Sequence, residues 1–149
     1  MPAVRVVARG VLLSGGRILL ARNLRKPHCF LPGGRVETGE AARAALEREF
    51  REETGLKVRA GRFLGAVEHV WKKKGELRQE LNLIFLVQAH MAKPGARVVS
   101  REEHLRFVWR PLSRLDAARL EPWPLRNWLA AALRRNASPR FDSSFSGEA

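Results

Sequence analysis

The amino-acid sequence predicts an α/β protein in which a mixed β-sheet lies between helices. The first observation is size, because 149 residues, 45% of them apolar, suffice for one domain with its own core. The second is order: short apolar segments typical of strands lie on both sides of a strongly helical segment at residues 40–54. The third is an amphipathic pattern over residues 124–135, which supplies another helix to pack on the sheet.

The N-terminal part of the chain is expected to form the first strands. Apolar and β-branched residues predict strands over residues 4–13, 17–21 and 29–31. Ser14-Gly15-Gly16 forms a tight turn between the first two strands. The short third strand delivers Gly33 and Gly34, which let the backbone turn sharply and expose its polar groups to a ligand.

The central helix is predicted from about Glu40 to Thr54. Thr38 is placed to cap its N-terminus, and Gly55 to form a left-handed C-cap. At about 100° per residue, the apolar residues form one face of this helix. They are Ala41, Ala42, Ala45, Leu46 and Phe50.

Three glutamates, Glu49, Glu52 and Glu53, follow the i, i+3, i+4 spacing in this helix. Such offsets share one face, so the carboxylates converge where repulsion would otherwise separate them. We expect them on the apolar side, near a helix end whose dipole disfavours negative charge. This placement implies a bound cation or raised pKa values, and a divalent cation with oxygen ligands is the natural candidate. Surface salt bridges with nearby arginines are the alternative.

The second half of the chain is expected to complete the sheet. Strands are predicted within residues 57–71, 80–91 and 104–110. The Lys72-Lys73-Lys74-Gly75 run reads as a hairpin tip, with a loop that grips phosphate or RNA as the alternative. A short helix is predicted over residues 111–120 and a longer one over residues 124–135. We therefore expect a domain over residues 1–135 and a polar, flexible tail over residues 136–149.

Composition limits the partners. The net charge of +13 suits polyanionic substrates and allows RNA as a partner. No apolar run is long enough to cross a membrane, and the N-terminus lacks a signal-peptide layout. Cys29 is alone, which excludes a disulfide framework and a cysteine-based zinc site. A cytoplasmic protein is the simplest expectation; the oligomeric state is not fixed, and a homodimer stays open.

The segment Gly34 to Leu56 also follows a fixed spacing, G-x(5)-E-x(7)-R-E-U-x-E-E-x-G-U, where U is apolar. A chance match in a chain this long is on the order of one in ten million, from ordinary residue frequencies. The matching residues are Gly34, Glu40, Arg48, Glu49, Phe50, Glu52, Glu53, Gly55 and Leu56. This spacing is the Nudix box, and the chain resembles a Nudix hydrolase over residues 1–135.

The resemblance implies an α/β/α sandwich and hydrolysis of a diphosphate linkage in a nucleoside diphosphate derivative, with Mg²⁺ or Mn²⁺. It implies that Glu49, Glu52 and Glu53 are metal ligands and that one of them acts as general base. The Gly34 carbonyl is expected as a further ligand, and Arg48 is expected to orient the glutamates.

Residues outside this core of the site are assigned as follows. Glu37 and Glu40 are expected to hold the loop rather than bind metal. Glu103, six residues ahead of Trp109, is predicted to add a metal ligand, with Glu102 and Glu80 as competitors. The predicted substrate contacts are Arg22, Phe30, Gly33 and Gly34.

The substrate is less constrained. Markers typical of ADP-ribose, dinucleoside-polyphosphate and coenzyme A hydrolases are not recognisable, and the chain has no Tyr. MutT-like cleavage of a nucleoside triphosphate or related nucleotide is therefore favoured. An ADP-ribose or nucleotide-sugar pyrophosphatase and an RNA 5′-end pyrophosphohydrolase are the alternatives. A non-catalytic nucleotide- or RNA-binding module is disfavoured by the intact glutamates.

Overall fold

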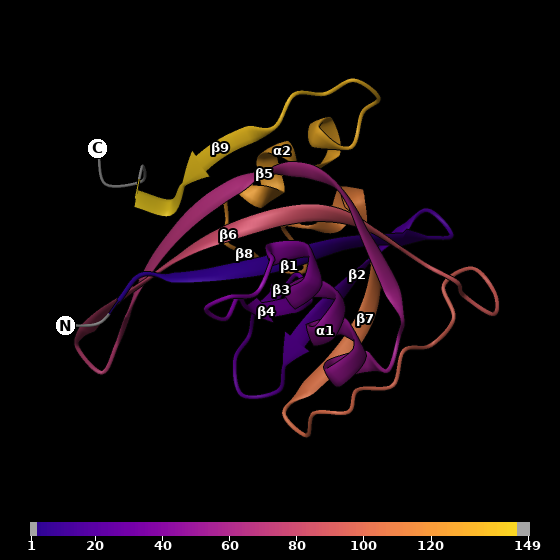
Figure 1. The fold of residues 1–149 in the computed structure, drawn as a ribbon, viewed down its shortest axis with the longest axis horizontal. Helices are drawn as coiled ribbons and strands as arrows, with labels where there is room; N and C mark the ends of the chain where they lie inside the picture. The colour runs from indigo at the N-terminus through magenta and orange to yellow at the C-terminus, as the bar shows by residue number, and fades with distance from the viewer. Residues whose placement is uncertain (1–2, 146–149) are drawn as a thin grey trace.

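A computed structural model of the chain describes residues 3–145, which form one curled sheet and two α-helices (Figure 1). The helices are α1 (Ala42–Thr54) and α2 (Leu125–Ala132), with a 3₁₀ turn η1 (Leu112–Arg114) between them. The strands are β1 (Arg5–Ser14), β2 (Arg17–Asn23), β3 (Cys29–Phe30), β4 (Gly33–Arg35), β5 (Val58–Lys73), β6 (Glu76–Ala89), β7 (Leu105–Pro111), β8 (Leu120–Glu121) and β9 (Arg140–Ser143).

The sheet is mixed, as predicted. Its strand order is β8-β3-β2-β1-β6-β5-β9, with β4 also paired to β1 and β7 to β2. β1 and β6 run parallel from the pair Arg5–Glu80 to the pair Leu12–Val87, whereas β5 and β6 form a long antiparallel hairpin. The hairpin turns at Lys74–Gly75, so the lysine run is the predicted hairpin tip.

The sheet separates two apolar clusters, because successive side chains of a strand point to opposite faces. In β2, Leu19 packs into the cluster that contains Phe50 of α1. Its neighbours Ile18 and Leu20 pack into the cluster that contains Trp128 and Leu129 of α2. The two helices therefore cover opposite faces, and the predicted α/β/α sandwich is confirmed (Figure 1).

Several local predictions need correction. α1 starts at Ala42, and its N-cap position is Ala41 with no side-chain hydrogen bond, so Thr38 does not cap it. The Glu40 carboxylate instead accepts a hydrogen bond from the Glu37 N–H group. At the other end, Gly55 has the predicted left-handed conformation, with φ of 74°. The helix predicted over residues 111–120 is reduced to η1 and turns.

The C-terminal segment contains a strand that the sequence analysis did not predict. β9 pairs in parallel with β5, from Gly65–Arg140 to Glu68–Ser143. Its four residues carry little of the apolar alternation that marks a strand, so the position of its partner determines its conformation. Residues 146–149 of the predicted tail lie outside the described part of the chain. Within residues 3–145, no helix has the length and apolar character needed to cross a membrane.

Candidate active site

The loop that enters α1 holds its acids against a glycine backbone. β4 pairs with β1, and Gly34 lies opposite Ala8. A Cβ atom on Gly34 would overlap the carboxylate of Glu49, so this carboxylate rests directly on the Gly34 backbone. Gly33, at φ of +144°, has equally little room, because a Cβ atom there would overlap the Ala8 carbonyl oxygen. The sequence thus brings Gly34 and Glu49 together, as the predicted site requires.

Arg48 ties this loop to the acids. Its guanidinium donates two hydrogen bonds to Glu40, from Nε to Oε2 at 2.7 Å and from Nη2 to Oε1 at 2.9 Å. Nη1 donates to Glu49 at 3.0 Å and to Glu52 at 3.3 Å. Nη2 also reaches the Arg35 carbonyl oxygen at 3.2 Å, which fixes the loop to the helix. The hydrogen bonds that Arg48 donates to Glu40 first, and to Glu49, raise the pKa of Arg48 above its ordinary value.

The three glutamates differ in exposure. Glu53 is buried, with 9% of its surface exposed, and Glu49 is half-buried. Glu52 is exposed, with 55% of its side chain accessible. The prediction that all three turn to the apolar side is therefore wrong for Glu52. It lies about 100° around the helix axis from Glu53, on the side of Arg48.

Burial changes the ionisation of the inner pair. Desolvation, followed by repulsion from Glu49, raises the pKa of Glu53 to about 8. Desolvation also raises the pKa of Glu49, although the hydrogen bond from Arg48 opposes this shift. Interaction between the two carboxyl groups therefore contributes to the raised pKa of Glu53. Glu53 Oε2 has no hydrogen-bond partner among the described residues.

These donors fit a hard divalent cation. Two facing carboxylates, a third at the rim and a backbone carbonyl on the loop are the oxygen ligands that Mg²⁺ and Mn²⁺ prefer. Within residues 3–145, no three acidic, His or Cys side chains already stand in a coordinating arrangement. In this arrangement Arg48 engages Glu49 at 3.0 Å and Glu52 at 3.3 Å.

A fourth acid comes from the loop before β7. Glu102 is half-buried and its charge contributes to the raised pKa of Glu53, whereas Glu103 is exposed. The Arg101 N–H group donates to the Glu53 carbonyl oxygen at 2.7 Å, which anchors the loop on the end of α1. The Ser100 hydroxyl bonds both the N–H and the C=O group of Glu102, at 3.0 and 2.8 Å. Of the two acids, Glu102 is therefore the one whose charge acts on Glu53, and the metal-ligand role of Glu103 stays a prediction.

A cavity of about 240 Å³ adjoins the acids. It is lined by Arg5, Arg9, Lys26, His28, Phe30, His69, Trp71, Glu80, Glu121 and Pro122. His69 and Trp71 stack, with ring centroids 5.2 Å apart at 23°, and Arg5 lies over the Trp71 ring at 5.8 Å. A small polar cavity with several rings on its walls suits a planar base.

Arg9 lies between the cavity and the acids. Its guanidinium donates to the carbonyl oxygen of Leu31 at 3.1 Å and to the side chain of Asn82 at 3.3 Å. It also lies over the Phe30 ring at 5.3 Å. Burial lowers the pKa of Arg9, but Glu80, Glu53 and Glu49 all act in the opposite direction. Arg9 was missed as a site residue, although an arginine inside an apolar strand was a visible signal.

Three of the four predicted substrate contacts lie at the cavity or at the acid cluster, and the fourth does not. Phe30 lines the cavity, and Gly33 and Gly34 lie at the acid cluster. Arg22 is exposed on β2, paired with Cys29 and Arg106, and does not line the cavity. The residue of β2 opposite Phe30 is Ala21, one position earlier, so Arg22 points to the other face. Glu80, the third competitor for a metal ligand, lines the cavity within 3.8 Å of Arg5 and Arg9.

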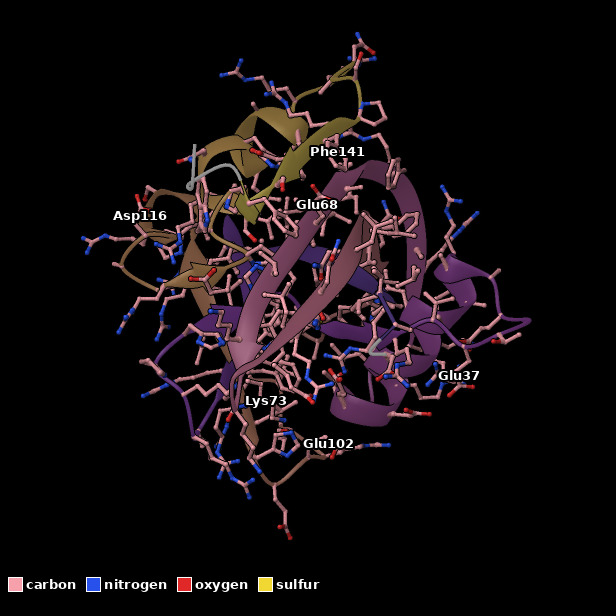
Figure 2. All side chains as sticks on the ribbon, turned by 90° about the vertical axis from the view of Figure 1, so that its left-hand side faces the viewer. Glu37, Glu68, Lys73, Glu102, Asp116 and Phe141 are labelled. Carbon is pink, nitrogen blue, oxygen red and sulfur yellow. The ribbon has the colours of Figure 1, made fainter. Side chains whose placement is uncertain are left out.

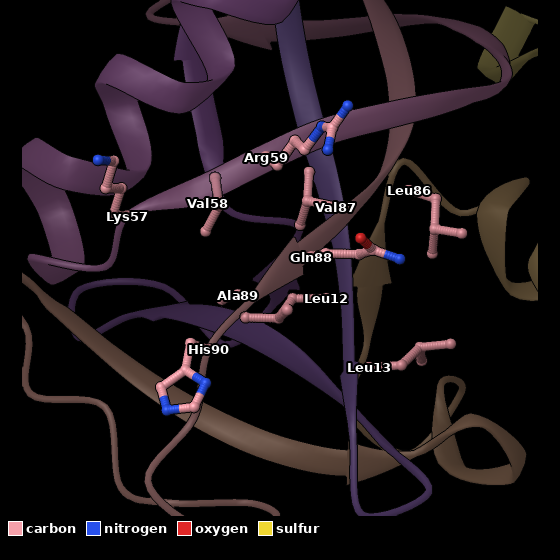
Figure 3. A pocket seen from close by; sticks show the side chains of 10 residues that line it. All are labelled: Leu12, Leu13, Lys57, Val58, Arg59, Leu86, Val87, Gln88, Ala89 and His90. Carbon is pink, nitrogen blue, oxygen red and sulfur yellow. The ribbon is translucent and has the colours of Figure 1, made fainter.

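A larger hollow of about 720 Å³ lies at the opposite end of β6 (Figure 3). Its lining residues are Leu12, Leu13, Lys57, Val58, Arg59, Leu86, Val87, Gln88, Ala89 and His90. None of them is acidic, so this hollow offers no place for a cation that would bridge protein and phosphate. The smaller cavity beside the acids is the candidate substrate site.

Comparison with known proteins agrees with this geometry. The family model described as the NUDIX domain matches residues 2–132. The chain belongs to the Nudix family of pyrophosphohydrolases. Members of this family use divalent metal ions, in keeping with the oxygen donors around Glu53. The resemblance predicted from the Nudix box is confirmed.

Individual relatives cover less of the chain. A putative 8-oxo-dGTP diphosphatase 2 of Mycobacterium tuberculosis is 43% identical over 58 residues, 36% of this chain and 41% of that protein. An ADP-ribose pyrophosphatase of Methanocaldococcus jannaschii is 43% identical over 67 residues, 43% of this chain and 38% of that protein. The matched part is thus less than half the length of either relative. A crystal structure of the MutT protein from Methanosarcina mazei has a TM-score of 0.69 at 22% identity and covers 92% of this chain and 98% of that one, which supports the fold.

Proposed function

We propose that this Nudix chain hydrolyses a phosphoanhydride bond of a nucleoside triphosphate or a closely related nucleotide, with Mg²⁺ or Mn²⁺ as cofactor. The observation that carries the proposal is the juxtaposition of the acid cluster with a base-sized cavity, joined by Arg9. A nucleotide substrate needs both parts, because its phosphates require a bound cation and its base requires a cavity with rings on which to stack.

The acid cluster would serve the phosphates. Glu49, Glu52, Glu53 and the Gly34 carbonyl would hold the cation, with Glu102 as the further acid. The cation supplies neutralisation of the diphosphate charge and lowers the pKa of the attacking water. Arg48 keeps the glutamates oriented through its bonds to Glu49 and Glu52.

The cavity would serve the nucleoside. Phe30 and Trp71 present rings against which a base can stack, which stabilises binding by about 1–3 kcal/mol per base in known cases. Arg9 places a buried positive charge at the junction, where it favours the polyphosphate chain that must pass from cavity to acids. The names of the two relatives above, an 8-oxo-dGTP diphosphatase and an ADP-ribose pyrophosphatase, support the same class of substrate.

The test is a magnesium-dependent screen of nucleoside triphosphates, nucleotide sugars, ADP-ribose, dinucleoside polyphosphates and 5′-triphosphorylated RNA. The Glu53→Gln variant serves as the control for contaminating phosphatases, and Glu103→Gln, an exposed acid, as its matched control. We expect turnover of a triphosphate by the wild type and by Glu103→Gln but not by Glu53→Gln. Nucleotide binding without turnover of any substrate would instead favour a non-catalytic module.

A second candidate substrate is the triphosphorylated 5′ end of RNA. A groove of about 430 Å³ continues from the cavity and shares Arg5, Lys26 and Trp71 with it. Its other lining residues are Ala3, Arg35, Lys73, Arg78 and Gln79, so five of its eight residues are cationic. Lys73 lies at the tip of the β5–β6 hairpin (Figure 2). A groove of this charge suits the phosphates that follow a 5′-terminal nucleotide.

This candidate is tested with the variant Arg35→Gln/Lys73→Gln. If RNA is the substrate, its affinity falls steeply with salt, and the variant loses about tenfold in RNA turnover with a shallower salt slope. Turnover of free nucleoside triphosphates should stay unchanged, because neither residue lines the cavity. Salt-insensitive RNA binding, or equal losses on both substrates, would remove this candidate.

A further inference from the structure

The C-terminal strand reaches the candidate substrate cavity from outside the Nudix box. β9 lies along the edge of β5, as both views of the molecule show (Figures 1 and 2). The pairing ends at Glu68–Ser143, so the next residue, Ser144, arrives beside His69. His69 lines the cavity and stacks on Trp71.

β5 is shaped to receive this strand. Gly65 has φ of +153°, a conformation that side chains disfavour, and lies at an irregularity in the β5–β6 register. A Cβ atom there would overlap the Arg140 carbonyl oxygen and lie 3.0 Å from its nitrogen. The absence of a side chain at position 65 is therefore what allows β9 to dock.

The end of β9 then curves into the site. The Ser143 N–H group donates to Asp142 Oδ1 at 2.7 Å, and the Phe145 N–H group donates to the Ser143 hydroxyl at 3.1 Å. Such local bonds turn the chain away from the extended conformation. They bring the Ser144 hydroxyl to 3.0 Å from the Val70 nitrogen and to 3.0 Å from His69 Nδ1.

The Ser144 hydroxyl is thus bonded on two sides. It accepts a hydrogen bond from the Val70 N–H group, which polarises its own O–H group to donate. When this O–H group donates to Nδ1, the proton of a neutral His69 ring is on Nε2. Within residues 3–145, Nε2 has no hydrogen-bond partner, so it is free to meet a ligand in the cavity.

We propose that Ser144 is a positioning residue for nucleotide recognition, which holds His69 with an Nε2–H donor directed at an acceptor atom of the bound base. The proposal rests on the proposed nucleotide function of the adjoining cavity. It makes the C-terminal segment part of the substrate site, although this segment lies beyond the region that the family model matches.

The experiment measures binding without turnover. Affinities of nucleoside 5′-monophosphates and of ribose 5-phosphate, which lacks a base, are determined by calorimetry for the wild type and for Ser144→Ala. We expect Ser144→Ala to lower the affinity for the monophosphate that the wild type binds most tightly by about three- to tenfold, the value of one hydrogen bond. The affinity for ribose 5-phosphate should stay unchanged. Ser138→Ala is the matched control, because this exposed serine makes no contact with the cavity.

Three further measurements test whether Ser144 positions His69 or only stabilises the local structure. The ¹⁵N spectrum of His69 should show the Nε2–H tautomer in the wild type and a mixture in Ser144→Ala. In a His69→Ala background, Ser144→Ala should cost less than twofold, because the two residues act through one contact. Truncation after Pro139, and Gly65→Ala as the variant that blocks docking of β9, should reproduce the loss seen with Ser144→Ala.

The proposal is overturned if Ser144→Ala binds monophosphates like the wild type, if ribose 5-phosphate weakens equally, or if the His69 and Ser144 effects add. Failure of the proposed function has a different signature. In that case the substrate screen shows no turnover that depends on Glu53, whatever happens at Ser144.

Discussion

The acid cluster and the base cavity adjoin each other but are built in opposite ways. The three acids of α1, their orienting arginine and their glycine support all come from one continuous segment, Gly34 to Glu53. The residues that line the cavity come from β1, the loop before β3, and strands β3, β5, β6 and β8. The residues of the Nudix box are therefore neighbours in the chain, whereas the cavity depends on how distant strands pair.

The two regions also differ in charge, and each compensates the other. The acid cluster buries Glu53 and half-buries Glu49, while the cavity carries Arg5, Arg9 and Lys26. Arg9 stabilises both inner carboxylates across the boundary, and they favour its charge in return. A polyphosphate would be drawn to the cationic side and require a cation on the other.

The largest expected effect lies in the local region. Glu53→Gln removes one carboxylate while keeping the shape of the side chain, and should lower kcat by about three orders of magnitude. The fold should be retained, because a neutral side chain suits this buried site at least as well as a charged one. Steady-state kinetics with circular dichroism checks this. Turnover near the wild-type value would remove Glu53 from the metal site.

The same contrast explains what could be predicted from the sequence. Glu49, Glu52, Glu53 and Arg48 follow from spacing alone, because neighbours on one helix keep their relation whatever surrounds them. The mixed sheet followed from strand patterns on both sides of α1. Spacing could not tell that Glu52 faces solvent, which depends on what packs against each side of the helix.

The cavity residues could not be predicted in this way. Arg9 reaches Asn82 across 73 residues, and His69 reaches Ser144 across 75, so each contact depends on the complete sheet. β9 has little strand pattern of its own and forms because β5 offers an edge with a glycine at position 65. The different exposure of Glu102 and Glu103 depends on a loop that is anchored to the end of α1, where the Arg101 N–H group bonds the Glu53 carbonyl oxygen.

The next effect is a pH dependence of stability in the metal-free protein. Burial raises the pKa of Glu53 to about 8 in the fold, from its ordinary value of 4.5 in the unfolded chain. Between these values the folded state holds a proton that the unfolded state has lost. The stabilisation is therefore complete below pH 4.5 and is lost as the pH rises towards 8, by about 4 kcal/mol.

Thermal unfolding at pH 5 and pH 8 in the presence of a chelator measures this change. The Glu53→Gln variant, which cannot titrate, should show a smaller decrease between the two pH values. Added Mg²⁺ should raise the melting temperature more at pH 8 than at pH 5, because it binds the ionised carboxylates. Equal slopes for wild type and variant would show that Glu53 does not carry the buried proton.

In the cavity, Phe30→Ala tests base stacking. Loss of a ring that stacks on the base should raise KM by about tenfold and leave kcat within about twofold, because the acids are untouched. Phe141→Ala is the matched control, since this phenylalanine is exposed on β9 with 66% of its surface accessible. A parallel fall in kcat would place Phe30 in the chemistry rather than in the binding of the nucleoside.

The remaining prediction distinguishes two neighbouring acids in the loop before β7. Glu102→Gln should weaken activation by Mg²⁺ about tenfold, because Glu102 is the acid whose charge reaches Glu53. Glu103→Gln should leave the Mg²⁺ titration unchanged, because that carboxylate is exposed. The two variants carry the same chemical change one residue apart, so general effects on the loop cancel in the comparison. If Glu103→Gln gave the larger shift, the loop would have to turn by one residue on binding the cation, and the acid cluster would then depend on long-range structure as the cavity does.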